Sequence, residues 1–175
     1  MFARPAAGRR LHILLPLLAM AAGCSDVLRI ALDNEPEVPV KNEPGLTALG
    51  TQFGQAVQKG DFAAAYALCS SQLKARTPEE KFVTDLKNDW QLHSEGVRPQ
   101  KIEVQPWMVL EDEFKEWEDM PKDIKYAQVA GLVNVDFGLQ VEDDEIVTSV
   151  STDLVVVEEG GQPKIAYVCE LRTPN

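Results

Sequence analysis

The most informative segment of this chain is residues 59–82, which read KGDFAAAYALCSSQLKARTPEEKF and contain two helix boundaries. Gly60 accepts the left-handed conformation in which many helices end, and Asp61 can cap the start of a new helix. Thr77 suits the N-cap of a further helix and Pro78 its first turn, because a glutamate follows three residues after the threonine. The segment therefore predicts one helix that ends at Gly60 and two more that begin after Asp61 and Thr77.

Three apolar stripes at helical spacing accompany these boundaries. Apolar residues that recur every three or four positions lie on one face of a helix. We expect the buried faces of the three helices to be Leu46, Leu49, Phe53, Ala56 and Val57, then Phe62, Tyr66, Cys69 and Leu73, and finally Phe82, Leu86 and Trp90.

The rest of the chain has the period-two alternation and the β-branched residues that are typical of strands. The expected strands are residues 102–105, 127–137, 146–157 and 164–171. Two sets of residues are each expected on a single sheet face: Val129, Val133, Val135 and Phe137, and Ile165, Tyr167, Cys169 and Leu171. The glycines within Glu159–Gln162 predict a hairpin turn. Helices that precede strands indicate an α+β fold, with N-terminal helices packed on one face of an antiparallel sheet.

The chain divides into three parts. Residues 1–23 have a basic start and then a charge-free apolar stretch, Leu11–Gly23, as in a secretory signal peptide. That stretch is shorter than the roughly 20 residues that a membrane span needs. Residues 24–44 are rich in proline and acids and predict an extended linker. Residues 45–175 form the expected folded domain.

The net charge excludes some functions. The chain carries 17 basic and 28 acidic residues, and removing residues 1–23 leaves 14 basic and 28 acidic ones, a net charge of −14. A nucleic-acid partner is not expected, because affinity for nucleic acid depends on cations that neutralise phosphates. The only histidine after residue 23 is His93, so a Ser–His–Asp or Cys–His arrangement could be built only around it. No motif for a cofactor is present, and none is expected.

The end of the signal segment has a specific pattern. Ala21-Ala22-Gly23-Cys24 resembles the lipobox of bacterial lipoproteins. This resemblance implies that the Cys24 thiol receives a diacylglyceryl group and becomes the mature N-terminus. Ser25 follows in place of an aspartate, which by the same resemblance implies transport to the outer membrane, facing the periplasm. The alternative is an ordinary signal peptide with Cys24 as a disulfide partner.

The order of elements also has a precedent. Residues 59–82 and the terminal hairpin VVVEEGGQPKIAYV, residues 155–168, resemble the nuclear transport factor 2-like (NTF2-like) superfamily in its bacterial lipoprotein form. The likeness covers about residues 46–171. It implies a cone like that of SnoaL, ketosteroid isomerase and the cystatin-like folds, in which a curved antiparallel sheet wraps around helices and often encloses a pocket. The family contains both enzymes and non-catalytic binding domains, so fold alone does not assign an activity.

Catalytic members that resemble ketosteroid isomerase use an Asp base with Tyr and a protonated Asp as oxyanion donors. Here Asp136 and Asp153 fall in expected strands, but their spacing from the tyrosines marks no constellation. We therefore assign no catalytic residue. The candidates for a pocket lining are Tyr66, Trp90, Tyr126 and Tyr167.

Cys69 and Cys169 are expected to form a disulfide. With Cys24 lipidated, these two cysteines remain in an oxidising compartment, and both fall on apolar faces that point between helix and sheet. The alternative is two buried thiols.

Two acid-rich stretches, residues 111–119 and 142–145, flank the strands. They lack the calcium-loop pattern with its fixed glycine, so we interpret them as solvated loops and expect no metal. Trp107, Phe114 and Trp117 surround the first stretch and predict a short amphipathic helix that lies on the sheet. The alternative is a partner surface, where tryptophan is enriched.

Together these features predict a lipid-anchored protein of the bacterial cell envelope. Its domain would bind a small apolar ligand or an envelope protein without catalysis of its own. An isomerase-like or dehydratase-like enzyme that uses Asp and Tyr for proton transfer is the alternative.

Overall fold

The computed structural model describes residues 38–117, 120–143 and 145–173. The signal segment and Cys24 lie outside the described residues, so the lipobox stays a prediction. The compact unit that contains the described residues begins at Val38, seven residues before the boundary expected at residue 45. Val40 already packs against the core.

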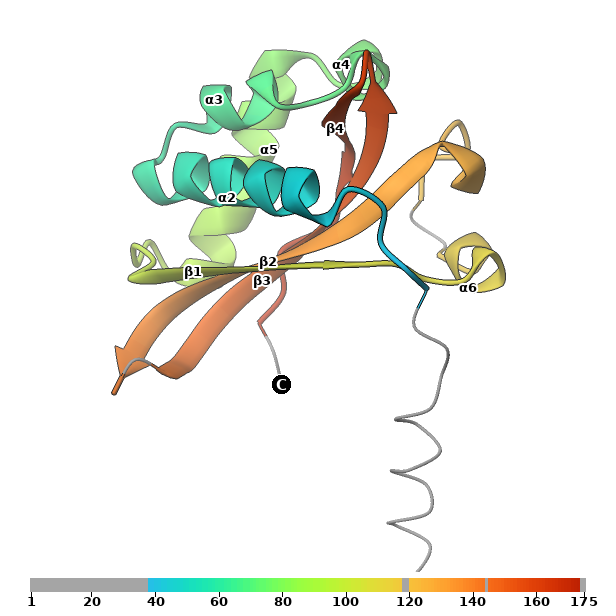
Figure 1. Ribbon diagram of the computed structural model, residues 1–175. Helices are drawn as coiled ribbons and strands as arrows, with labels where there is room; N and C mark the ends of the chain where they lie inside the picture. The colour runs from blue at the N-terminus through green and yellow to red at the C-terminus, as the bar shows by residue number, and fades with distance from the viewer. Residues whose placement is uncertain (1–37, 118–119, 144, 174–175) are drawn as a thin grey trace, which may run out of the picture. The chain divides into compact units, whose positions relative to one another are not determined.

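Four helices form the N-terminal half of the domain (Figure 1). They are α2 (Glu43–Lys59), α3 (Phe62–Ala67), α4 (Ser71–Arg76) and α5 (Glu79–Ser94). Gly60 ends α2 with a φ of 71°, and Asp61 accepts a hydrogen bond from the Ala64 N–H at 3.0 Å. The boundary expected at Gly60 and Asp61 is therefore confirmed.

The helix expected after Asp61 is interrupted, which corrects the prediction of one continuous stripe. The Ser70 N–H donates to the Ile165 carbonyl at 2.8 Å, and the Ile165 N–H donates to the Leu68 carbonyl at 3.2 Å. These bonds place Leu68–Ser70 beside strand β4 (Gln162–Val168), so the chain leaves the helix to pair with a strand edge. The Ser70 hydroxyl then caps α4.

The third helix begins one residue later than expected. Pro78, not Thr77, is the N-cap residue of α5, and it makes no side-chain capping bond. The Thr77 carbonyl instead accepts a hydrogen bond from the Tyr66 hydroxyl at 3.0 Å. The expected buried face of this helix, Phe82, Leu86 and Trp90, is confirmed.

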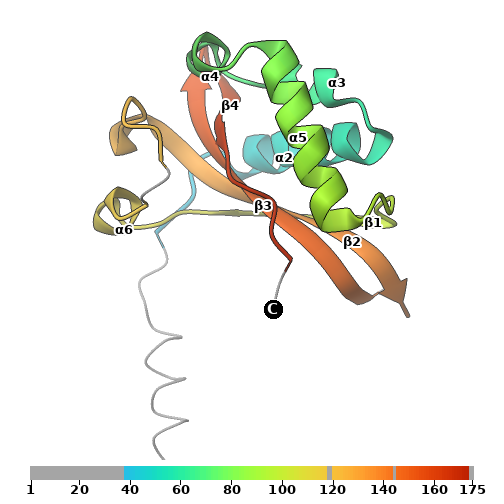
Figure 2. The same cartoon turned by 180° about the vertical axis from the view of Figure 1, so that it is seen from behind.

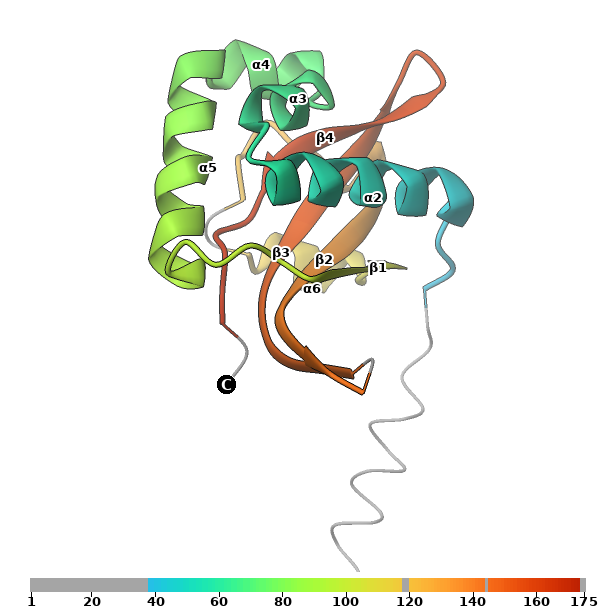
Figure 3. The ribbon, with the colours of Figure 1, turned by 90° about the vertical axis from the view of Figure 1, so that its left-hand side faces the viewer.

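The sheet is a meander of four antiparallel strands. Its remaining strands are β1 (Lys101–Trp107), β2 (Val129–Glu142) and β3 (Glu145–Glu159), and the spatial order is β1-β2-β3-β4. Strands β2 and β3 are long and curve together (Figure 3). Gly160 and Gly161 have φ values of 61° and 75°, as a tight hairpin turn between β3 and β4 requires. The structure therefore has the expected α+β class, with helices followed by an antiparallel sheet.

Apolar side chains cover both faces of the sheet. The face toward α2–α5 carries the main core, which we call the helix-side core; its strand residues include Val133, Val135, Phe137, Val150, Leu154, Val156 and Ile165. The opposite, outer face is covered over part of its area by α6 (Glu111–Lys115) and the 3-10 turn η1 (Tyr126–Gln128). The buried residues of this outer-face cluster are Val109, Phe114, Ile124, Leu132, Val155, Val157 and Ala166.

Two β-bulges correct the expected face assignments. In the β2–β3 pairing the register shifts between Val129 and Gly131. In the β3–β4 pairing it shifts opposite Val155 and Val156, where Ala166 is the extra residue. A bulge inserts one residue and changes which side chains share a face. Val129 and Tyr167 consequently pack with the outer-face cluster rather than with the helix-side core.

Candidate functional site

An apolar groove runs between α5 and the C-terminal part of β4, which lie side by side in Figures 2 and 3. We call it the α5–β4 groove; its volume is about 620 Å³. Its apolar lining comes from α4, α5 and β4 and comprises Leu73, Phe82, Leu86, Leu92, Tyr167 and Val168. Leu92 lies at the rim of the groove with 74% of its surface exposed to solvent. Burying a leucine side chain would lower the free energy of the protein.

Carboxylates predominate among the charged groups of the groove. Asp85, Asp89 and Glu170 line it, together with the single guanidinium of Arg76. One Asp89 oxygen accepts a hydrogen bond from the Leu171 N–H at 2.9 Å, and the other lies 3.1 Å from His93. Asp89 therefore holds the segment after β4 against α5.

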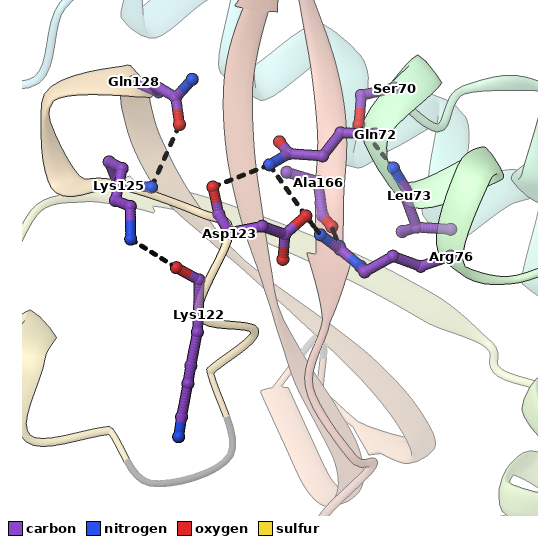
Figure 4. A network of polar contacts seen from close by, with 9 residues as sticks. All are labelled: Ser70, Gln72, Leu73, Arg76, Lys122, Asp123, Lys125, Gln128 and Ala166. Carbon is purple, nitrogen blue, oxygen red and sulfur yellow. Dashed lines mark hydrogen bonds and ion pairs between the residues drawn. The ribbon is translucent and has the colours of Figure 1, made fainter.

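A polar network is centred on Arg76, which also lines the groove (Figure 4). Arg76 forms an ion pair with Asp123 at 2.5 Å and donates a second hydrogen bond to the Ala166 carbonyl at 2.5 Å. The Gln72 amide donates to both the backbone carbonyl and the carboxylate of Asp123. Burial is the largest influence on the pKa of Asp123 and raises it, but the hydrogen bonds from Arg76, Gln72 and the backbone, with the charge of Arg76, together leave the pKa below its usual range.

The free edge of β4 meets this groove at Val168. The Cys169 N–H donates to the Asp153 carbonyl of β3 at 2.9 Å. Because the bonds of an antiparallel ladder alternate along a strand, the neighbouring N–H and C=O of Val168 face away from β3. Val168 also lines the groove, so its backbone donor and acceptor lie at the groove wall.

A second, polar depression of about 410 Å³ lies on the outer face, over Glu103, Gln105, Asn134 and Asp136. One Asp136 oxygen is buried and has no hydrogen-bond partner among the described residues. Burial raises the pKa of Asp136, a hydrogen bond from Ser149 opposes this, and the charge of Glu103 raises it further; the net direction is upward.

The nearby Asp153 is only 3% exposed, but its carboxylate is fully engaged. It accepts a hydrogen bond from Asn134 at 3.0 Å and pairs with Arg172 at 2.5 Å. Asp153 therefore supports the outer face of the sheet and carries no sign of a reactive role.

The four expected pocket residues do not form one site. Tyr66 packs against Phe82 with ring centroids 5.3 Å apart, and Trp90 packs edge-on against Phe137 at 5.1 Å, both on the helix side of the sheet. Tyr126 lies in the outer-face cluster, where its hydroxyl donates to the Val109 carbonyl. Of these four residues, Tyr167 alone is part of the α5–β4 groove.

The acid and tyrosine residues considered for proton transfer are also separated. Asp136 and Asp153 both lie on the outer face of the sheet. In the β2–β3 register Asp136 is opposite Ser151, and Asp153 is opposite Asn134. Tyr66 lies on the other side of the sheet with the helix-side core. Tyr126 and Tyr167 share the outer face with both aspartates, but neither of them lines the polar depression over Asp136.

The expected disulfide is not formed in the structure, which contains Cys69 and Cys169 as thiols. Cys69 lies beside Ile165, four residues before Cys169 on an extended strand. Four residues of regular strand would span roughly 13 Å at about 3.3 Å per residue, and the bulge at Ala166 shortens this span. A disulfide needs about 4.4–6.8 Å. The two cysteines share an apolar environment but not a position along the strand, and their pairing stays a prediction for thiol chemistry to test.

The aromatic residues around the first acid-rich stretch pack on the sheet, as expected. The Phe114 and Trp117 rings lie 6.1 Å apart, as do those of Trp107 and Trp117. Phe114 is buried in α6 against the outer face. Among the described residues, no group of three or more His, Cys, Asp or Glu side chains could hold a metal ion.

Sequence reasoning missed Leu92, Val168 and the Arg76–Asp123 pair. The sequence offers one indication for Leu92, since it is an apolar residue of α5 outside the buried stripe of Phe82 and Leu86. The role of Val168 had no local signal, since it depends on which edge of β4 other segments cover.

Comparisons with known proteins add no assignment: no family model, no curated protein and no solved structure matches this chain. Within the described ranges, every helix is too short or too polar to cross a membrane.

Proposed function

We propose that this chain is a lipid-anchored protein of the bacterial cell envelope, whose domain is NTF2-like and binds a partner molecule in the α5–β4 groove without catalysis. The order of helices followed by an antiparallel meander supports the NTF2-like assignment. The lipobox-like sequence before Cys24 supports the anchor. Attachment of at least two acyl chains there would give stable membrane association.

The observation that carries the binding function is the apolar groove with Leu92 exposed at its rim. Apolar, concave surfaces of this size are typical of ligand and partner sites. Leu92 extends the apolar surface of the groove to its rim, and a contiguous apolar surface of this kind supports a binding site.

A photo-crosslinking amino acid at position 92 tests the binding function in the native host. We expect a covalent adduct at position 92 and none at position 147, which is also exposed but does not line the groove. Mass spectrometry of the adduct distinguishes a small ligand from a protein. Equal labelling at both positions, or no adduct at position 92, would contradict binding in the groove.

The anchor has a separate test. Cys24→Ala should abolish incorporation of labelled palmitate and release the protein from the membrane fraction. Cys169→Ala is the matched cysteine control and should leave both unchanged. A Cys24→Ala variant that keeps its label and its membrane association would contradict lipidation at Cys24.

An enzyme of the cone-pocket type is the less favoured alternative. Its support is the raised pKa of Asp136 beside a polar depression. This depression lies on the outer face, whereas Tyr66 lies on the helix side. Among the residues that line the depression, Asp136 and Glu103 are the two acids that could transfer a proton there.

A further inference from the structure

We propose that the molecule bound in the α5–β4 groove is an extended, positively charged polypeptide segment that adds to the edge of β4 at Val168 as a short extra strand. This inference rests on the proposed binding function and specifies the chemistry of the partner. Recognition of peptides by strand addition combines backbone hydrogen bonds with pockets for alternate side chains.

The chain already pairs with this edge of β4 at one position. Leu68–Ser70 lies parallel to the strand and exchanges two backbone hydrogen bonds with Ile165. Farther along, the Ala166 carbonyl is covered by the Arg76 guanidinium. The edge is therefore covered at Ile165 and Ala166, and its next outward-facing residue is Val168.

At Val168 the backbone is positioned for a partner strand. Its N–H and C=O face away from β3, and they take part in none of the backbone hydrogen bonds that the described residues make outside their helices and strands. A backbone donor and acceptor on the wall of an apolar groove gain from a partner that supplies both groups. An extended peptide does so, whereas an apolar small molecule lacks the matching pair.

The groove also suits alternating side chains. Successive side chains of a strand point to opposite sides. For a strand added beyond β4, one side meets Leu86 and Leu92 of α5. Alternate apolar residues of the peptide would cover these leucines and account for the exposure of Leu92.

The charge of the groove favours a basic partner over an acidic one. Three carboxylates line the groove against one guanidinium, that of Arg76. Asp85 is paired with Lys81 and Asp89 with His93, just as Arg76 is paired with Asp123, so the lining itself keeps an excess of acids. Complementary charge speeds association and rejects partners of the wrong sign. A segment with lysine or arginine between its apolar residues is therefore the favoured ligand.

The test measures fluorescence anisotropy of labelled six-residue peptides with the mature chain from residue 24, carrying Cys24→Ser. The probes are Lys-Leu-Lys-Val-Lys-Leu, its glutamate counterpart Glu-Leu-Glu-Val-Glu-Leu, and the lysine peptide with alternate backbone nitrogens methylated in either register. We expect the lysine peptide to bind, and one methylated register to bind at least about tenfold more weakly, as the loss of a backbone hydrogen bond predicts.

Two variants locate the peptide. Val168→Pro removes an outward-facing N–H, which an edge strand tolerates, and should weaken binding by about tenfold. Leu92→Lys should weaken it through repulsion and loss of apolar contact, while Val147→Lys, the matched exposed control, should not. Circular dichroism checks that each variant is folded. Methylation of the peptide tests the same backbone hydrogen bonds without altering the protein.

Four results would overturn this inference. The first two are stronger binding of the glutamate peptide than of the lysine peptide, and no binding of any peptide. The third is equal binding of both methylated registers and the parent peptide. The fourth is Nile red fluorescence that depends on Leu92 while no peptide binds. If the position-92 crosslink still forms in any of these cases, the groove binds a molecule and only the strand-addition proposal fails. If the crosslink is also absent, the proposed function fails with it.

Discussion

Arg76 and Asp123 join α4 to the loop before η1 across the edge of β4, with their charged atoms 2.5 Å apart. The same guanidinium bonds the Ala166 carbonyl. An uncovered strand edge is a template for unwanted pairing with other chains. The pair therefore restricts the open part of this edge to the short stretch beside the α5–β4 groove.

Arg76→Ala should lower the free energy of unfolding by about 1–2 kcal/mol at pH 7. The ion pair itself is partly exposed and contributes at most about 1 kcal/mol, and the rest comes from the lost bond to Ala166. Because the pKa of Asp123 is lowered in the folded state, its contribution is present above the ordinary pKa of an aspartate and is lost as the pH falls through the folded-state pKa.

Urea denaturation of both proteins at pH 7 and at pH 3 measures this effect. The difference between wild type and Arg76→Ala should shrink at pH 3. Lys81→Ala is the control, because it removes an exposed pair with Asp85 and should change stability by less than about 0.5 kcal/mol. An Arg76→Ala difference that stays constant with pH would contradict a role for the Asp123 charge.

Gly54→Ala should destabilise the domain by about 1–3 kcal/mol, even though alanine favours a helix by roughly 1 kcal/mol. A β-carbon at Gly54 would lie 2.8 Å from the Ile102 side chain, because α2 packs closely on β1. Gly45→Ala in the same helix is the matched control. Its new methyl would meet only the Asn42 side chain, which can rotate away.

Thermal denaturation of both variants separates the two effects. We expect the melting temperature to fall for Gly54→Ala and to stay equal or rise for Gly45→Ala. A stabilised Gly54→Ala protein would mean that α2 does not lie as close to the sheet as the structure places it.

The sequence predicts this fold well where the cause is local. The end of α2 at Gly60, the cap at Asp61 and the turn at Gly160 depend on residues next to one another, and all three are confirmed. The interruption at Ser70 depends on a bond to Ile165, 95 residues farther along the chain. The bulge at Ala166 depends on how β4 pairs with β3, and alternation alone reveals neither feature.

The candidate site was harder to predict for the same reason. The groove exists because α5 and β4 come together in the fold, and the exposure of Val168 depends on what covers the rest of its strand edge. Aromatic residues instead suggested a pocket, but Tyr66 and Tyr126 fill cores on opposite faces of the sheet. Apolar patterning identifies buried residues without telling a packed core from an open groove.

Asp136→Asn should raise the melting temperature slightly at pH 7, by less than about 3 °C, since solvent screens a partly exposed group. Burial first, and then the charge of Glu103, make the ionised carboxylate less favourable in the folded state. The folded protein therefore binds the proton more tightly than the unfolded chain, and stability falls as the pH rises from the ordinary aspartate pKa through the folded-state value.

Melting curves between pH 4 and pH 7 check the sign of this effect. The advantage of Asp136→Asn over wild type should grow as the pH rises. Asp112→Asn controls for the change in net charge, since the Asp112 side chain is 97% exposed. An advantage that shrinks with rising pH would show that the Asp136 carboxylate is stabilised, not disfavoured, by its surroundings.

Cys69 should resist alkylation in the folded protein. Its side chain is 2% exposed, and burial raises the pKa of its thiol to about 12, with Lys74 and Lys164 opposing the shift only in part. Only the thiolate reacts, so at pH 8 the reaction should be roughly a thousandfold slower than for an ordinary cysteine, whose pKa is about 8.5.

Iodoacetamide labelling with peptide mapping, with and without urea and always without reductant, measures both the reactivity and the bonding of this thiol. Urea should expose Cys69 and restore ordinary labelling, because the thiol is not joined to Cys169 in the structure. A Cys69 peptide that stays unlabelled in urea until reductant is added would reveal a disulfide. Such a bond would require β4 to shift along Leu68–Ser70, since Cys69 lies opposite Ile165, four residues before Cys169, at the present register. Ordinary labelling without urea would instead show that the segment beside Ile165 opens readily, and that the covered part of the β4 edge is available to a partner as well.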